Sequence, residues 1–295
     1  MGKKVYSGET PKNTTFRKDL QKVKSKVVTL DDAIRLSGLK DGMTISFHHH
    51  FRSGDKVVNM VVGRLAEMGF KNLHLAASSL SDVHAPLIEH IRNGVITKIS
   101  TSGLRGELAK EISHGLMKEP VIFRSHGGRG SDIANDNLHI DVAFLAASAC
   151  DPAGNASGYS RSPNAKSICG SLGYAKPDAQ HADKVVIITD DLVDYPNTPN
   201  SISEHDVNYV VLVDSVGDSS KISSGAIRDT KNPRDILLAM NAAKVIINSG
   251  YFRKDSPSRP VLAVRLSQSS SISARKCSNV ESMQASPSAE LPPTW

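Results

Sequence analysis

Three consecutive histidines, His48, His49 and His50, follow an apolar segment and precede Arg52 and Asp55. In an extended backbone His48 and His50 share a face, so with Asp55 they form a set of possible metal ligands. Arg52 offers a planar guanidinium that can hold a carboxylate through two hydrogen bonds. A metal site, a solvated loop and a polar active-site rim all fit this segment. The sequence favours the polar rim, and we expect no bound metal.

A second segment, SHGGRG at residues 125–130, can bind an anion. Its backbone N–H groups and the guanidinium of Arg129 can donate hydrogen bonds to an anion, as the corresponding groups of phosphate-binding turns do. The segment matches neither G-x-G-x-x-G nor G-x-x-x-x-G-K-[ST], so nicotinamide or ATP binding has little support. A flexible glycine turn without a ligand stays the alternative.

The sequence gives little support for a cysteine or serine nucleophile. Cys150, Cys169 and Cys277 show no CxxC spacing, which argues against a disulfide framework or a zinc knuckle. Cys150 and Cys169 have no activating partner at a recognisable spacing, and cysteine is often a small buried apolar residue. The G-x-S-x-G pattern of serine hydrolases is absent.

The segments that carry these motifs alternate between strand-like and helix-like patterns. Val57, Val58, Val61, Val62 and Leu65 have helical spacing, for example. Such alternation predicts an α/β fold with an open, mostly parallel sheet and helices on both faces. We expect strands at 43–47, 72–77, 95–100, 139–147, 184–189, 209–214 and 244–248, and helices from Thr29, over 55–68, within 85–93, over 104–116 and over 233–243.

Ligands of parallel sheets bind at the carboxyl ends of the strands. The first three expected strands all end in polar residues, at 46–52, 78–81 and 101–106. No residue is assigned a catalytic role from the sequence. The candidates for substrate or anion binding are Ser46, His48, His49, Arg52, Gly103, Arg105, His126 and Arg129.

The net charge of +6 resides at the two ends of the chain. Residues 1–30 hold eight Lys or Arg and two acids, and residues 253–295 hold six and three. The slightly acidic body argues against a nucleic-acid-binding face, and the basic ends lack interleaved aromatics, which disfavours the competing hypothesis of a nucleic-acid binder. The start has no apolar signal region, and no apolar run approaches the roughly 20 residues of a membrane span. We therefore expect a cytoplasmic protein without a membrane partner.

Seven motifs occur in order along the chain: DGMTISFHHHFRSGD (41–55), GFKNLHLAASSLSDVHAPLIEHIRNGV (69–95), TSGLRGELAKEIS (101–113), SHGGR (125–129), CDPAGN (150–155), CGSLGY (169–174) and NSGYF (248–252). Together they closely resemble the family of citrate lyase α subunits, the citrate CoA-transferase component of that lyase. The resemblance covers about residues 30–252. The turn at 151–155 is also similar to one shared more widely among CoA-transferases.

The resemblance implies a reaction and its partners. The family exchanges the acetyl group on the acyl-carrier γ subunit for citrate, which gives citryl carrier and acetate, and the β subunit then cleaves the citryl thioester to oxaloacetate. The substrate is an acyl-CoA or the CoA-like prosthetic group of the carrier, and no covalently bound cofactor is expected. A glutamate in a second, similar half attacks the thioester in related enzymes. That half lies beyond the resemblance, so we expect this chain alone to be inactive; the alternative is a non-catalytic remnant that binds lyase partner subunits.

The sequence changes character after Phe252. Residues 253–295 contain eleven Ser and five Pro, a composition that predicts disorder. The family continues with a stretch like GFSLQTGTGGASLAV, and residues 254–269 can spell it when their codons are translated one base out of register. We therefore expect a change of reading frame near Phe252, which genomic DNA without an intact downstream α-subunit frame would refute. The expected organisation is a basic arm at 1–28, a CoA-transferase-like domain at 29–252 and an out-of-frame tail at 253–295.

Overall fold

The computed structural model describes residues 24–48, 50–163, 167–222 and 232–249. It divides the chain into two units, residues 1–222 and 223–295. The first unit holds the sheet and most helices, and the second contributes one described helix, α8 (Pro233–Asn248). The tail at 253–295, expected to be disordered, lies outside the described residues, as does most of the basic arm.

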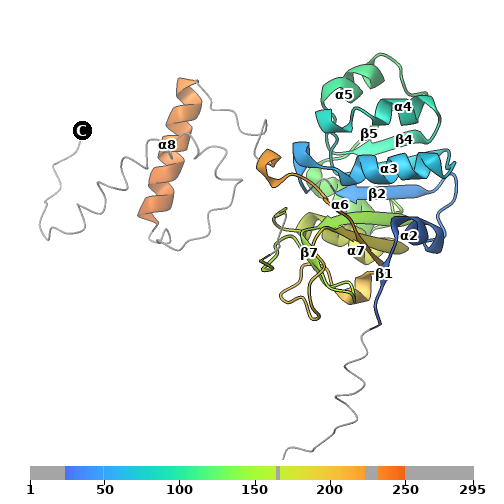
Figure 1. Ribbon diagram of the computed structural model, residues 1–295. Helices are drawn as coiled ribbons and strands as arrows, with labels where there is room; N and C mark the ends of the chain where they lie inside the picture. Colours follow the sequence, from blue (N-terminus) through green and yellow to red (C-terminus); the bar gives the residue numbers. More distant parts are fainter. Residues whose placement is uncertain (1–23, 49, 164–166, 223–231, 250–295) are drawn as a thin grey trace, which may run out of the picture. The chain divides into compact units, whose positions relative to one another are not determined.

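An eight-stranded sheet forms the centre of the first unit (Figure 1). Its strands follow the order β1-β10-β9-β6-β2-β3-β4-β5, and every neighbouring pair is parallel. The expected mostly parallel sheet is thus confirmed. The strands are β1 (Val27–Val28), β2 (Thr44–His48), β3 (Leu73–Ala77), β4 (Ile96–Thr101), β5 (Ile122–Phe123), β6 (Val142–Ala147), β9 (Lys184–Thr189) and β10 (Tyr209–Leu212), while β7 (Ala149–Cys150) and β8 (Ala156–Ser157) form a separate antiparallel pair.

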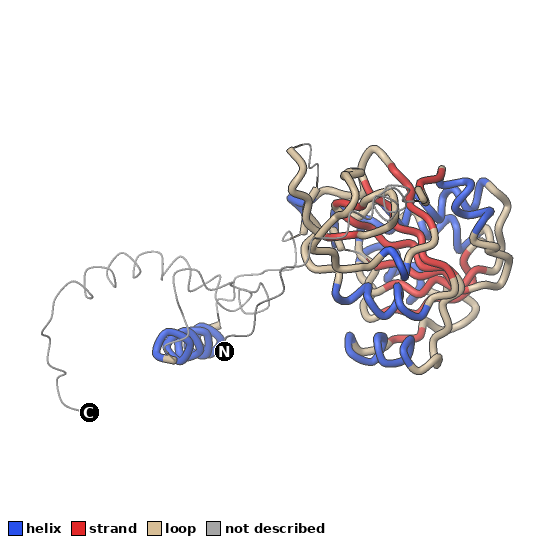
Figure 2. The backbone as a smooth tube through the Cα atoms, turned by 90° about the horizontal axis from the view of Figure 1, so that it is seen from below, coloured by secondary structure: helices blue, strands red, loops and turns tan. Residues whose placement is uncertain are grey.

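Helices cover both faces of this sheet (Figure 2). Right-handed crossovers place the helices between β2 and β5 on one face, and the reversal of strand order after β5 places α6 and α7 on the other. Figure 1 shows α2 and α3 in front of the sheet and α7 behind it. The helices are α2 (Leu30–Leu36), α3 (Val57–Glu67), α4 (Leu87–Arg92), α5 (Gly106–Ser113), α6 (His126–Ala134) and α7 (Lys176–His181).

Local sequence explains where these helices begin. Thr29 caps α2, as expected, because its side chain accepts a hydrogen bond from the N–H of Asp32 at 3.1 Å. At the start of α3, where Lys56 is the N-cap, the carboxylate of the preceding Asp55 accepts a hydrogen bond from the N–H of Val58 at 3.1 Å. The five aliphatic residues of α3 that share a face are all buried, so this stripe fixes the helix against the sheet.

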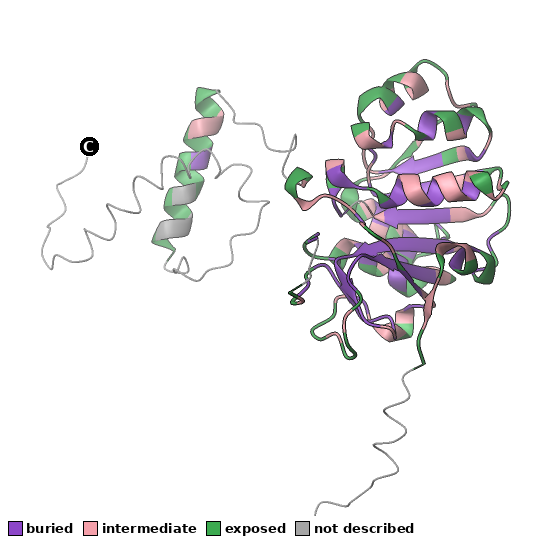
Figure 3. Cartoon of the chain, viewed as in Figure 1, coloured by how far each residue is buried: buried purple, intermediate pink, exposed green. Residues whose placement is uncertain are grey.

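The core lies between the sheet and its two helical layers (Figure 3). All six residues of β6 are buried, as a central strand covered on both faces requires. The rings of Phe47 on β2 and Phe144 on β6 stack with centroids 5.6 Å apart. Strand β9 has the bounds that its β-branched run predicts, and five of its six residues are buried.

The structure differs from the sequence-based expectation in several parts. The strand expected at 244–248 is the last part of helix α8, because a short apolar run does not distinguish strand from helix and the helix started at Pro233 continues through it. Strand β6 begins at Val142 rather than at 139. The sheet also starts before residue 29, since β1 pairs with β10 and Lys26 Nζ donates to the carbonyl of Glu204 at 2.6 Å.

The described helices include none that is both long and apolar enough to cross a membrane.

Candidate functional site

The strand order reverses between β2 and β6, which are neighbours at the centre of the sheet. From β2 the chain proceeds outward through β3, β4 and β5, then returns to β6 and proceeds outward the other way through β9 and β10. Loops that leave the carboxyl ends of two such strands diverge and leave a crevice between them. The carboxyl end of β2, where His48 lies, is therefore the place in this fold where a ligand site is expected.

Aromatic rings from three segments meet at this end of β2. The centroids of His48 and His50 are 4.0 Å apart, and His48 meets the ring of Tyr174 edge-on at 4.8 Å. On its other side Tyr174 stacks on His126 at 4.0 Å with an interplanar angle of 1°. The phenol of Tyr174 donates to the carbonyl of His126 at 2.8 Å. The structure thus brings two predicted residues, His48 and His126, to one cluster through a tyrosine that sequence reasoning missed.

Two further candidates, Ser46 and Arg129, form a buried ionic network beneath this cluster. The guanidinium of Arg129, 1% exposed, donates from Nη1 and Nη2 to the two carboxylate oxygens of Asp178 at 2.8 and 2.6 Å. It also donates to Ser46 Oγ at 2.9 Å and to the carbonyl of Ala76 at 3.2 Å. Ser46 Oγ donates to Asp178 in turn.

This network engages Arg129 and Ser46, two of the candidates for substrate binding, with a carboxylate inside the protein. Burial alone would lower the pKa of Arg129, but the Asp178 carboxylate outweighs it and the pKa is raised. The guanidinium is therefore a fixed charge inside the protein, already paired with an internal carboxylate. The two residues join β2, α6 and α7 and position the rim above them.

The segment SHGGRG is the start of helix α6 rather than a flexible turn. The hydroxyl of Ser125 accepts from the N–H of Gly128 at 3.0 Å and caps the helix. The glycines are helical, and one of the N–H groups expected to hold an anion is already bonded. The sequence missed this helix because glycine lowers helix propensity, whereas the cap and the tertiary contacts of Arg129 override it.

The remaining predicted cations lie on the surface at strand ends. Arg52 is exposed and adopts φ of 51°, a left-handed conformation that is uncommon for a residue with a side chain. The turn after it is held because the Asp218 N–H donates to the Gly54 carbonyl at 3.0 Å, and a Cβ at Gly54 would lie 2.2 Å from the Asp218 carbonyl oxygen. Such a strained, well-fixed position is typical of functional loops.

Arg105 and Gly103 lie at the end of β4. Arg105 is exposed and precedes α5, and its N–H donates to the Leu80 carbonyl at 3.0 Å. Gly103 lies close to the serine-rich end of β3, because a Cβ there would be 3.0 Å from Ser79 Oγ. His49 lies outside the described residues.

The Asp55 carboxylate bonds to groups that hold the fold together, His84 and the N–H of Val58. Its Oδ2 lies 3.3 Å from Nε2 of His84, and both side chains are buried. The N–H of Ser81 donates to Nδ1 of His84 at 2.9 Å, so Nε2 carries the ring proton and faces the carboxylate. Together with the bond that Asp55 accepts from the N–H of Val58 in α3, these bonds tie the loops after β2 and β3 together.

The turn at 151–155 forms a hydrogen-bonded wall at the carboxyl edge of the sheet. Asp151 Oδ1 accepts from the N–H groups of Ala153, Gly154 and Asn155 at 2.9–3.0 Å, so this turn uses its donors internally. Asp151 Oδ2 accepts from the Asn197 N–H at 2.9 Å, and Asn155 Nδ2 donates to Asp151 at 2.8 Å.

Beside this wall lies an open cavity of about 740 Å³. Tyr159, Arg161, Asp191 and Asn197 contribute to its lining, and none of the seven predicted residues that the structure describes does. Sequence reasoning missed these residues, although Tyr159 and Arg161 lie in the segment between β6 and β9, and Asp191 and Asn197 in the segment that follows β9. Arg161 is the one basic side chain among the described lining residues.

The two described cysteines are poor nucleophiles. Burial raises the pKa of the Cys150 thiol well above its usual range and that of Cys169 to about 11. Because the thiolate is the reactive form, both side chains are inert at neutral pH.

The comparison with known proteins agrees with this architecture. A family model described as "Citrate lyase, alpha subunit (CitF)" matches residues 22–258. The chain belongs to the citrate lyase alpha subunit family. The citrate lyase alpha chains of Klebsiella pneumoniae and Escherichia coli are 57% and 55% identical to it over 250 and 245 residues.

These matches cover 84% and 83% of this chain but 48% and 47% of the two relatives, so this citrate lyase alpha family member spans about half their length. A solved structure described as the alpha subunit of citrate lyase from Streptococcus mutans in complex with citrate is 54% identical. It superposes with a TM-score of 0.69 and covers 79% of this chain and 45% of that one.

More distant structures share the fold alone. A malonate decarboxylase alpha subunit from Acinetobacter baumannii is 20% identical with a TM-score of 0.54, and an Escherichia coli acyl-CoA transferase is 11% identical with a TM-score of 0.51. The fold is thus the CoA-transferase-like α/β fold expected for a citrate lyase alpha subunit.

The buried pair predicts a large loss of stability on Asp178→Asn. The substitution leaves the Arg129 charge without its counterion, which typically costs about 3–5 kcal/mol. Chemical denaturation followed by circular dichroism measures it. Glu89→Gln, which removes the exposed pair of Glu89 and Arg92 at 2.6 Å, is the control and is expected to cost at most about 1 kcal/mol. Equal effects of the two substitutions would contradict a buried ionic network.

The raised pKa of Cys169 predicts a pH-dependent contribution to stability. The native thiol holds its proton more tightly than the unfolded chain does, so this contribution is full below the ordinary thiol pKa of about 8.5. It is lost as pH rises toward about 11. Between pH 8 and pH 10 the free energy of unfolding should fall by about 1–2 kcal/mol more in the natural chain than in Cys169→Ala. Parallel pH profiles from denaturant titrations would refute this.

Proposed function

We propose that this chain supplies the carboxylate-binding half of a citrate CoA-transferase. In the proposed reaction the acetyl group on a carrier thioester is exchanged for citrate, which yields citryl carrier and acetate and supports cleavage of citrate to oxaloacetate and acetate. The main support is the citrate complex of the Streptococcus mutans relative, whose chain is 54% identical to this one. The fold adds a crevice where the strand order reverses, the usual place for a ligand in such sheets.

The substrate-binding groups that we propose lie around the carboxyl end of β2. Arg52 and Arg105 are exposed cations that can each hold a carboxylate through two charge-assisted hydrogen bonds. His48, which meets Tyr174 edge-on, and His126, which stacks on it, provide ring nitrogens or ring faces at the same end. We propose no substrate contact for Ser46 or Arg129, because both are engaged with Asp178.

The acyl-transferring nucleophile is not assigned to this half. The described thiols are buried and hold their protons, which removes them as candidates. We infer that the carboxylate that forms the covalent acyl intermediate belongs to the second half of the family's architecture. The groups described above then orient citrate toward that intermediate.

The proposed partners are the β subunit and the acyl-carrier γ subunit of a citrate lyase complex, in the cytoplasm. The CoA-like group of the carrier, or an acyl-CoA, is the proposed co-substrate, with no covalently held cofactor and no metal taking part in the reaction. The relatives are named as alpha chains of citrate lyase, which supports a place in such an assembly.

A citrate-binding measurement tests the site. Arg52→Gln removes one guanidinium and should weaken citrate binding by about tenfold to a hundredfold, the usual effect of losing a hydrogen-bonded ion pair. Arg35→Gln removes an equally exposed arginine that pairs with Asp31 and Asp32 on α2, and it should leave binding unchanged. Isothermal titration calorimetry compares the two. Equal citrate affinity in both variants would place the binding site elsewhere.

An activity measurement tests the division of labour. A polypeptide of residues 1–295 should produce no citryl carrier when β subunit and acetylated γ subunit are supplied, because no residue in it takes the acyl group. Joining residues 1–252 to the second half of a relative should restore exchange. Turnover by residues 1–295 would place the nucleophile within residues 30–252. Co-purification with lyase subunits without turnover, both before and after that fusion, would favour the non-catalytic binding remnant.

A further inference from the structure

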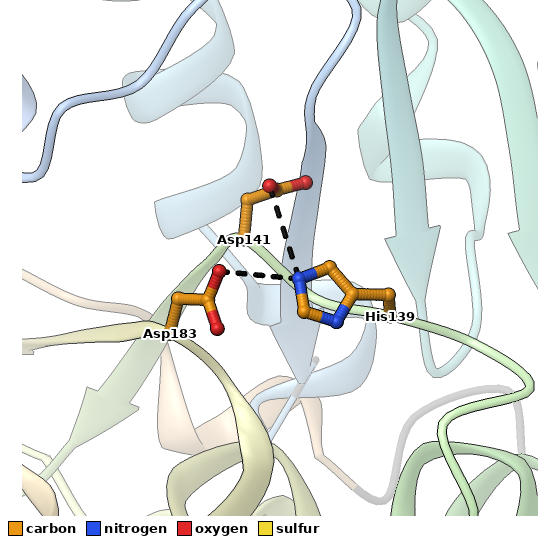
Figure 4. Close-up of side chains that lie close together, drawn as sticks. All are labelled: His139, Asp141 and Asp183. Carbon is orange, nitrogen blue, oxygen red and sulfur yellow. Dashed lines mark hydrogen bonds and ion pairs between the residues drawn. The ribbon is translucent and has the colours of Figure 1, made fainter.

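A cluster of possible metal ligands lies at the opposite edge of the sheet, where β6 and β9 begin. His139 and Asp141 precede β6, and Asp183 precedes β9. Nε2 of His139 lies 3.1 Å from Asp183 Oδ2 and 3.9 Å from Asp141 Oδ1. The three ligand atoms all lie within 4.8 Å of one another. Figure 4 shows the imidazole directed toward both carboxylates.

Two contacts from outside these three ligands fix the arrangement. Nδ1 of His139 lies 3.0 Å from Asp136 Oδ1, so a third carboxylate orients the ring and makes Nε2 a better donor to a metal. The other oxygen of Asp141 accepts from the N–H of Thr44 on β2 at 2.7 Å, which holds its Oδ1 toward the histidine. A carboxylate behind a histidine is the usual support of a metal-binding imidazole.

We propose that His139, Asp141 and Asp183 bind a divalent transition-metal ion, with Zn²⁺ as the natural probe. One imidazole nitrogen and two carboxylate oxygens are a donor set that such ions accept, with water completing the coordination. Separations of 3.1 and 3.9 Å bracket the roughly 3.4 Å expected between two ligands of a tetrahedral ion with bonds of about 2.1 Å. Small side-chain rotations therefore suffice for binding.

Charge at the cluster also favours a cation. Three carboxylates, those of Asp136, Asp141 and Asp183, surround one imidazole at 3.0, 3.9 and 3.1 Å. A bound ion would replace the imidazole proton and join the loop before β6 to the start of β9. The site lies at the amino ends of the strands and is independent of the function proposed for the carboxyl ends.

A metal titration of the full 295-residue chain tests this site. The chain is freed of metal with a chelator and titrated with Zn²⁺ against a chromophoric competitor in mildly alkaline buffer. His139→Ala and Asp183→Asn should each lose one equivalent of bound Zn²⁺. Asp136→Asn should bind that equivalent about tenfold to a hundredfold more weakly.

His114→Ala is the matched control, because His114 is likewise exposed and lies outside the cluster. It should keep the stoichiometry of the natural chain, and so separates this site from zinc bound at the chain's other histidines. Since His139 and Asp183 are exposed, unchanged melting temperatures of the metal-free variants verify their folding. The visible d–d absorption of bound Co²⁺ gives a second measure, which should be lost in His139→Ala and Asp183→Asn and kept in His114→Ala. Equal Zn²⁺ stoichiometry and affinity in His139→Ala and His114→Ala would overturn the proposal.

Discussion

The ionic network of Arg129, Asp178 and Ser46 is the constraint on which the candidate site depends. It places a charged guanidinium in the core at the point where the strand order reverses, and it satisfies that charge with two carboxylate oxygens, a hydroxyl and a backbone carbonyl. Because β2, α6 and α7 each contribute or accept one of these bonds, none of them can shift without leaving a buried charge unpaired. The rings of His48, Tyr174 and His126 lie on this fixed base.

Much of the fold could be predicted from the sequence, because the spacing of apolar residues indicates which face of a helix or strand is buried. The run that became β9 and the aliphatic stripe of α3 predicted their elements closely. Two short elements were not predicted, for physical reasons. Strand β5 has only two residues, both exposed. The glycines of α6 lower its helix propensity, and the helix is held by its cap and by Arg129. The strand expected at 244–248 failed because the composition of so short a run fits either conformation.

The site was less predictable than the fold. Sequence position correctly brought His48 and His126 to one place, since both follow elements that end or begin at the carboxyl edge. It could not distinguish a guanidinium that binds ligand from one that binds an internal carboxylate, because Asp178 lies 49 residues from Arg129 along the chain. Tyr174 was missed for a similar reason: only the folded chain places its ring between two histidines.

The polar wall at 151–155 has a consequence for the order in which the protein acquires its shape. Its bonds to Asn197, Asn200 and Glu204 span 42–49 residues. Closing segments of that length has an entropic cost that must be met before the bonds form. Strand β9 lies between the two partners in the sequence, so its pairing with β6 shortens the length of chain that these bonds must close. We therefore expect the cavity beside the wall to assemble after β9 has joined the sheet.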